Sequence, residues 1–111
     1  MSFSTKESPD GIIIISCPTQ VTVNNSDELK NILEEFVTAG NYKFVIDLTQ
    51  TKYVDSSGLG AIVSRIAITR SNNGDVRVAT AIPEIKNLLE ITNLNKILKC
   101  FDDVAKAISN Y

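Results

Sequence analysis

The 111-residue sequence predicts an α/β fold: one domain, residues 1–111, with a mixed, mostly parallel sheet of about four to five strands packed against about four helices. Short aliphatic runs alternate with segments whose apolar residues recur at helical spacing, which is typical of strands followed by amphipathic helices. The nearly continuous apolar run 44–48 indicates a central strand covered on both faces. A Pro-Asp-Gly turn at 9–11 predicts one antiparallel pair at the start.

The first half of the chain is expected to form a hairpin, a loop, a helix and the central strand. Residues 3–6 and 12–16 are the arms of the hairpin, and 19–24 is expected to be an extended loop. Asn25 is the predicted N-cap of the helix, with Glu28 completing a capping box, and Gly40 ends it. The apolar stripe of this helix consists of Leu29, Ile32, Leu33, Phe36 and Val37.

The second half alternates in the same way. A short extended segment at 52–54 leads into a helix over about 57–72, which Asn73 and Gly74 close. A strand at 76–80, a helix from Pro83 to Asn93, a short strand at 97–101 and a terminal helix capped by Asp102 and Asp103 complete the fold. The residues expected to face inward are Leu59, Ile62, Val63, Ile66, Ala67, Ile85, Leu88, Leu89, Val104, Ala107 and Ile108.

Composition and charge narrow the classes of function. A hydrophobic fraction of 43% and a charged fraction of 22% are typical of a globular protein. The net charge of -2 lacks the basic excess of a nucleic-acid or membrane-surface binder, so a protein partner or a small ligand is expected. The longest aliphatic run is 12–15, and residues 1–9 do not resemble a secretory signal, so we expect a cytoplasmic location.

Residue usage also argues against catalysis. The chain has no histidine, which removes the commonest general base and the commonest metal ligand. Cys17 and Cys100 lie far apart in the sequence and are expected to be ordinary, partly buried thiols. We therefore expect a protein that is not an enzyme and that needs no metal or cofactor.

The candidate site is the segment Val54-Asp55-Ser56-Ser57-Gly58-Leu59-Gly60, where a strand gives way to a helix. Ser and Asp are favoured there as caps, and the unpaired N–H groups of a helix N-terminus also tolerate a phosphate. Two interpretations stay open: a plain helix cap, or a functional turn. No base accompanies the serines, and the segment lacks the Lys-Ser/Thr pair of a nucleotide-binding loop, so catalysis is not expected.

The two glycines favour a docking role. Each costs about 1 kcal/mol relative to alanine inside a helix, so we expect another backbone to approach closely. The outward side of the helix is predicted to carry a flat strip made of Ser57, Ala61, Ser64 and Ile68. The alternative is that Ile68 is merely one exposed apolar residue.

Two further clusters of charged residues stand out in the sequence. Asp47 with Asp55 suggests a phosphate-accepting acid site of the response-regulator kind, but the run 12–17 lacks the acidic pair that such a site needs for magnesium. Four cations are interspersed with acids and are expected to be a solvated surface rather than a basic patch: Lys52, Arg65, Arg70 and Arg77.

These residues together resemble the STAS domain and, within it, the bacterial anti-sigma-factor antagonists. The resemblance covers the hairpin, the helix after Asn25, the strand at 45–48, and the segments 53–60 and 88–98, with Asp-Ser-Ser-Gly-Leu-Gly as the specific part. It implies a regulator: an anti-sigma factor that is also a serine protein kinase binds the unphosphorylated antagonist, which frees a sigma factor for transcription. The kinase phosphorylates the serine after the aspartate, here Ser56, and a metal-dependent serine phosphatase reverses this.

The resemblance further implies that Asp55, Ser57, Gly58, Leu59 and Gly60 form the rest of the docking turn, with no nucleic acid or membrane as partner. The sequence departs from the family at Thr22, where phosphorylated members often carry an aspartate. This difference bears on which kinase recognises the turn and on how efficiently it transfers phosphate. Two alternatives remain. One is a STAS scaffold or accessory subunit, in a stressosome-like or lipid-transport assembly, with Ser56 only a cap. The other is a nucleotide-binding or nucleotide-hydrolysing module.

Overall fold

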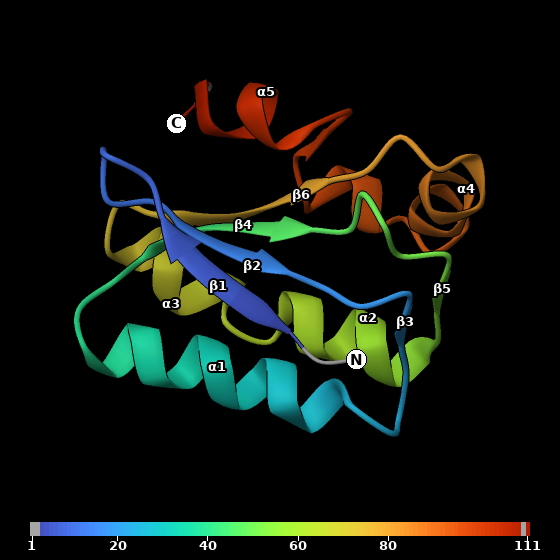
Figure 1. Ribbon diagram of the computed structural model, residues 1–111, viewed down its shortest axis with the longest axis horizontal. Coiled ribbons are helices and arrows are strands. Elements are labelled where there is room, and N and C mark those ends of the chain that lie inside the picture. Colours follow the sequence, from blue (N-terminus) through green and yellow to red (C-terminus); the bar gives the residue numbers. More distant parts are fainter. Residues whose placement is uncertain (1–2, 110) are drawn as a thin grey trace.

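The computed structural model describes residues 3–109 and residue 111, and its centre is a five-stranded sheet in the order β1-β2-β4-β6-β7 (Figure 1). The strands are β1 Ser4–Glu7, β2 Ile13–Ser16, β4 Lys43–Asp47, β6 Asp75–Ala79 and β7 Cys100–Phe101. β1 is antiparallel to β2 and the other neighbours are parallel, which confirms the opening hairpin and the mixed, mostly parallel sheet. β4 lies in the middle, as predicted.

A second, two-stranded parallel pair lies outside this sheet. It joins β3 Gln20–Val21 to β5 Tyr53–Val54, with Gln20 opposite Tyr53 and Val21 opposite Val54. The sequence predicted only an extended loop at 19–24, because a two-residue strand is too short to leave a periodic pattern. The pair brings the segment before the first helix alongside the candidate turn.

The helices are distributed unequally over the two faces of the sheet. They are α1 Ser26–Thr38, α2 Ser56–Val63, α3 Ile66–Ser71, α4 Pro83–Ile91 and α5 Val104–Ser109, with a 3₁₀ turn η1 Leu94–Lys96. Figure 1 shows α1, α2 and α3 below the sheet, α5 alone above it, and α4 at the right-hand end near β5. The described residues thus form five α-helices where about four were predicted, because one predicted helix is divided in two.

That division corrects the prediction of one helix over 57–72. α2 ends at Val63 and α3 begins at Ile66, and Arg65 between them has φ -120° and ψ 16°. The Ser64 hydroxyl donates to the Ala61 carbonyl oxygen at 2.7 Å, a local bond that competes with the helical ladder. Ala67, predicted to face inward, is exposed as a result of the altered direction of α3.

Apart from the break after Val63, the helix ends agree with the prediction except at Asn25 and at Asp102, whose carboxylate binds Lys86 instead of capping α5. The Asn25 side chain does not cap α1; its Oδ1 accepts from the Thr22 N–H at 2.9 Å and its Nδ2 donates to the Gln20 carbonyl at 2.9 Å. The predicted capping box is therefore wrong, and Asn25 braces the loop before the helix instead. Gly40, at φ +92°, ends α1, and Asp103 caps α5 by accepting the Lys106 N–H at 2.8 Å.

The sheet separates a large core from a small one. Alternate residues of β2 point to opposite faces: Ile13 and Ile15 to the large core under α1–α4, and Ile14 to the small core under α5. The α1 stripe packs on the large core through Leu29, Leu33 and Val37, as predicted. None of the helices in residues 3–109 is long and apolar enough to cross a membrane.

Candidate functional site

Asp55 organises the candidate site by binding two segments of backbone. It is the N-cap of α2, with extended φ and ψ of -95° and -175°, and its Oδ1 accepts the Gly58 N–H at 2.8 Å. Its Oδ2 accepts the N–H of Val23, in the loop before α1, at 2.9 Å. The backbone N–H of Gly58, and then that of Val23, hold the pKa of this carboxyl below its usual value of 3.8. Asp55 is therefore an ionised clamp between the two segments.

Ser56 is the first residue of α2 and its side chain is exposed. Its hydroxyl has no hydrogen-bond partner within the described part of the chain, whereas the neighbouring carboxylate is fully engaged. Ser57 is half-buried. The turn thus presents one free hydroxyl at the positive end of a helix dipole.

The two glycines of the turn have different surroundings. A Cβ at Gly58 would lie 2.2 Å from the Val21 carbonyl oxygen and 2.8 Å from Val54 Cγ1, so α2 packs directly on β3 there. The close backbone approach predicted from the sequence is present at Gly58, and the approaching backbone belongs to the same chain. A Cβ at Gly60 would meet nothing within 4 Å. Gly60 leaves open surface beside Ser56.

The predicted outward strip on the helix is wrong in one member. Ala61 is 0% exposed, because it belongs to the large core, on which α2 packs together with α1. Ser64 is half-buried and Ile68 is exposed, but Ile68 belongs to α3 beyond the break. The strip of Ser57, Ala61, Ser64 and Ile68 therefore does not form one flat surface. Leu59 is buried in the large core, as the helical stripe predicted.

The loop that carries Thr22 lies against the turn through the bond between Val23 and Asp55. Thr22 donates its N–H to Asn25 Oδ1, and its hydroxyl oxygen accepts the Asn24 N–H at 3.3 Å. A threonine in this position shapes the loop but adds no negative charge beside Ser56. The departure from the family pattern thus precedes Val23, whose N–H binds Asp55, the neighbour of the candidate phosphoacceptor.

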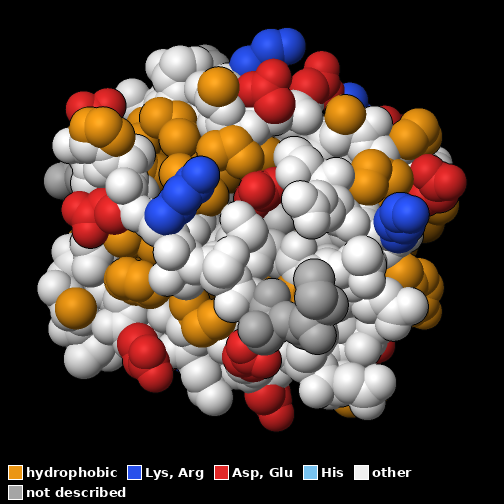
Figure 2. Space-filling view, viewed as in Figure 1, with side chains coloured by type: hydrophobic (Ala, Val, Ile, Leu, Met, Phe, Trp, Pro, Cys, Tyr) orange, Lys and Arg blue, Asp and Glu red, His pale blue; other side chains and the backbone are white. Residues whose placement is uncertain are grey.

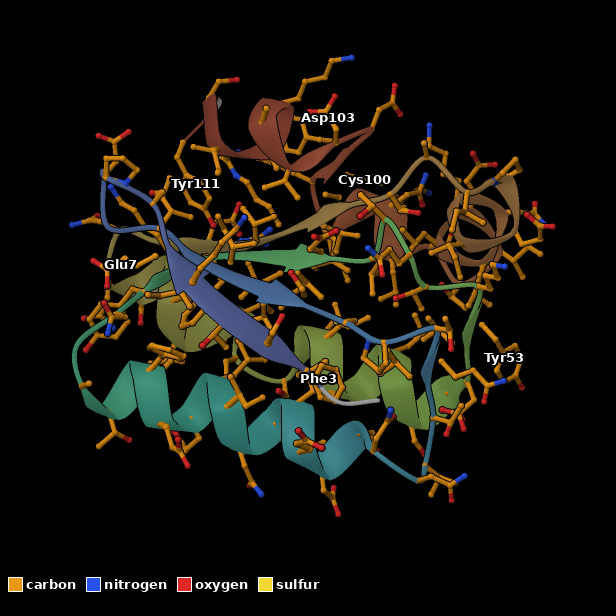
Figure 3. The ribbon with its side chains drawn as sticks, in the orientation of Figure 1. Phe3, Glu7, Tyr53, Cys100, Asp103 and Tyr111 are labelled. Atoms are coloured by element: carbon orange, nitrogen blue, oxygen red, sulfur yellow. The ribbon has the colours of Figure 1, made fainter. Side chains whose placement is uncertain are left out.

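Sequence reasoning missed two residues of this region, Val23 and Tyr53. Both are large apolar side chains that stand exposed, 69% for Val23 and 55% for Tyr53. Figure 3 shows Tyr53 pointing outward from the end of the molecule where β3 and β5 lie. The β3–β5 pairing, which turns Val21 and Val54 inward and Tyr53 outward, is the signal that would have found them.

The other sequence candidates lie apart from the turn. Asp47 ends β4, where it accepts from the Ser16 and Thr49 hydroxyls at 3.3 and 2.6 Å. Among the described residues, no group of three or more His, Cys, Asp or Glu is placed to hold a metal ion. Cys17 is buried and Cys100 half-buried, both as free thiols, and burial raises the pKa of each.

The four cations do not form a basic patch. Arg65 pairs with Glu34 at 3.1 Å, and Arg70 and Arg77 both pair with Asp75, at 3.0 and 3.5 Å. The expectation that all four are solvated is wrong for Arg77, which is buried because α5 and Tyr111 cover its face of the sheet. Lys52 is exposed.

Comparison with known proteins places this geometry in a family. The STAS domain model matches residues 4–107. An anti-sigma F factor antagonist of Paenibacillus polymyxa is 25% identical over 100 residues, 89% of this chain and 86% of that protein. An anti-sigma-B factor antagonist of Listeria monocytogenes is 26% identical over 99 residues, 89% and 87% of the two chains. The crystal structure of a Thermotoga maritima protein named as an anti-sigma factor antagonist superposes with a TM-score of 0.88 at 25% identity, over 97% of this chain and 92% of that one. Since the family model spans nearly the whole sequence, the chain belongs to the STAS domain family.

Proposed function

We propose that this chain, as one unit over residues 1–111, is an anti-sigma factor antagonist that works by partner switching. In its unphosphorylated form it binds an anti-sigma factor that is also a serine kinase, and the sigma factor is freed for transcription. Phosphorylation of Ser56 releases the antagonist, and a metal-dependent serine phosphatase restores it. The observation that carries the proposal is the exposed, unpartnered hydroxyl of Ser56 on a capped helix. The names of the relatives from Paenibacillus polymyxa and Listeria monocytogenes support it.

In this proposal the chain supplies only the hydroxyl group that accepts the phosphoryl group. Ser56 Oγ attacks the γ-phosphorus of ATP held by the kinase; the new O–P bond forms as the bond to ADP breaks, and the hydroxyl proton leaves to a base of the kinase. Asp55 is a poor base for that proton, because its two oxygens accept backbone N–H groups and its pKa is lowered. The chain needs no catalytic activity, cofactor, nucleic acid or membrane contact of its own, and it would act in the cytoplasm.

Phosphorylation would change the surface without unfolding the domain. The phosphate adds a charge of about -1.5 to -2. The helix N-terminus favours an anion at this position, so the fold should persist. A partner carboxylate within several ångströms would meet a repulsion on the order of a few kcal/mol at an intermediate dielectric, which lowers affinity roughly ten- to hundredfold.

The test uses purified anti-sigma kinases encoded in the same genome, each incubated with the protein and ATP. Intact-mass measurement should show the gain of one phosphoryl group on the wild type and on Ser57→Ala, and none on Ser56→Ala. A Ser56→Ala protein that is phosphorylated to the same extent as the wild type would remove the assignment. Ser56→Asp should keep its melting temperature and bind the kinase about ten- to hundredfold more weakly by titration calorimetry. Unchanged affinity would contradict the switch.

Thr22 favours one second candidate, a STAS scaffold or accessory subunit that works without phosphorylation. The loop beside Ser56 carries a hydroxyl where phosphorylated relatives often have a carboxylate. In that case Ser56 and Asp55 serve only as the start of α2. A kinase that binds the wild type tightly yet transfers no phosphoryl group to it would favour this candidate over the switch.

A further inference from the structure

Val23 and Tyr53 are presented on fixed backbone, although their side chains are exposed. The Val23 N–H is held by Asp55 Oδ2 at 2.9 Å, and Tyr53 lies in β5 with its N–H directed at the Thr19 carbonyl oxygen at 3.3 Å. Their neighbours Val21 and Val54 are buried in the large core and anchor both segments. Holding these side chains in place for a partner therefore requires little additional ordering of the backbone.

Both side chains belong to the segments that frame Ser56. The Val23 N–H is bonded to Asp55, the residue immediately before Ser56, and Tyr53 lies two positions before Asp55, in β5. Figure 2 shows hydrophobic side chains reaching the surface along the right-hand rim, the end of the molecule where Figure 3 places Tyr53. A protein whose catalytic site reaches Ser56 Oγ has to cover this rim.

We infer that Val23 and Tyr53 are the apolar anchors by which the anti-sigma kinase docks on this chain, an inference that rests on the proposed function. The occupant is a folded protein with apolar depressions beside the position that receives Ser56. Tyrosine is one of the residues that dominate binding at protein interfaces, and burial of the exposed valine would add apolar contact area beside it. Gly60, one helical turn after Ser56, leaves the surface of α2 open to close approach.

This arrangement gives the phosphate a second way to block docking. A doubly negative group on Ser56 would have to be buried among apolar contacts, where desolvation opposes it in addition to any repulsion between charges. Salt screens the repulsion between exposed charges but leaves the desolvation penalty largely unchanged. The difference in kinase affinity between the wild type and Ser56→Asp should therefore persist in high salt.

The experiment measures binding of the variants to the purified kinase that phosphorylates Ser56. Val23→Ser and Tyr53→Ser should each weaken binding about tenfold, and Tyr53→Phe, which keeps the ring, should bind as the wild type does. Ile97→Ser is the matched control, since Ile97 is 44% exposed and its carbonyl accepts from Arg70, which pairs with Asp75 at the start of β6. That is the opposite end of the sheet from β3 and β5, so binding should not change.

The outcomes separate the inference from the function on which it rests. Equal affinity of the kinase for the wild type, Val23→Ser and Tyr53→Ser would contradict the anchor role of these two side chains. It would not affect the proposed phosphorylation switch. Loss of affinity in Ile97→Ser equal to that in the anchor variants would also contradict the anchor role. Sedimentation of the protein alone as a dimer that Val23→Ser dissociates assigns the surface to a second copy instead. Failure of every purified kinase to bind or phosphorylate the wild type removes the proposed function itself.

Discussion

Gly58 and Gly60 stand two residues apart in one turn, and the structure uses them for different purposes. Gly58 faces inward, where the Val21 carbonyl and Val54 leave no room for a Cβ. Gly60 faces outward into open space. The difference teaches that a single short motif serves folding on its inner side and leaves its outer side open for the docking that we propose. Substitutions on the two sides should therefore separate stability from binding.

Gly58→Ala should have the largest effect on stability. The added methyl would lie 2.2 Å from backbone rather than from the flexible end of a side chain, so α2 has to move away from β3. We expect a loss of about 3 kcal/mol of unfolding free energy, at the upper end for overpacking. Urea unfolding followed by circular dichroism measures it. A variant as stable as the wild type would show that α2 does not pack on β3 as described.

Leu59→Ala should have the next largest effect. Leu59 belongs to the large core, so its truncation leaves a cavity under α2 and should lower the unfolding free energy by about 2 to 3 kcal/mol. The same urea titration measures this, and kinase affinity of the remaining folded protein should change little. An unchanged midpoint would mean that Leu59 faces outward and contributes to docking rather than to the core.

Burial of helical residues could be predicted from the sequence for α1 but not throughout α2. Leu29, Leu33 and Val37 were predicted to be buried because one helical face against one core produces a regular spacing. Ala61 was misplaced because α2 packs against both α1 and β3, and a helix covered by more than one neighbour loses that regular spacing. The break at Ser64 and the braced Asn25 both involve side-chain bonds to backbone three residues away, which compete with the regular helix and with the capping box.

The residues of the candidate site likewise differ in whether a local sequence pattern predicts them. The position of Asp55, Ser56 and the glycines at a helix start was predictable, because caps and helix formers are local signals. Val23 and Tyr53 were not, because they reach the site only through the pairing of β3 with β5 and through the bond from Val23 to Asp55. Arg77 likewise became buried through α5 and Tyr111, which are distant in sequence.

Asp55→Asn should have a smaller, pH-dependent effect on stability, because Asp55 joins the turn to the loop before α1. The pKa of Asp55 is lowered by folding, so its carboxylate stabilises the fold fully above its unfolded value of 3.8. This stabilisation is lost as the pH falls through the still lower pKa of the folded state. Wild type should therefore melt at a higher temperature than the variant at neutral pH, and the gap should narrow below 3.8. A gap that is independent of pH would contradict the ionised clamp.

Gly60→Ala should have the smallest effect on stability and the opposite sign. Because a Cβ meets nothing within 4 Å, the substitution improves helix propensity without a clash and should raise the unfolding free energy by about 0.5 to 1 kcal/mol. The same methyl projects into the surface on which we propose that the kinase docks, so affinity should fall while stability rises. Paired urea titrations and calorimetry on this one variant test both halves. A Gly60→Ala variant that is less stable than the wild type, or that binds the kinase with unchanged affinity, would contradict the different roles assigned to Gly58 and Gly60.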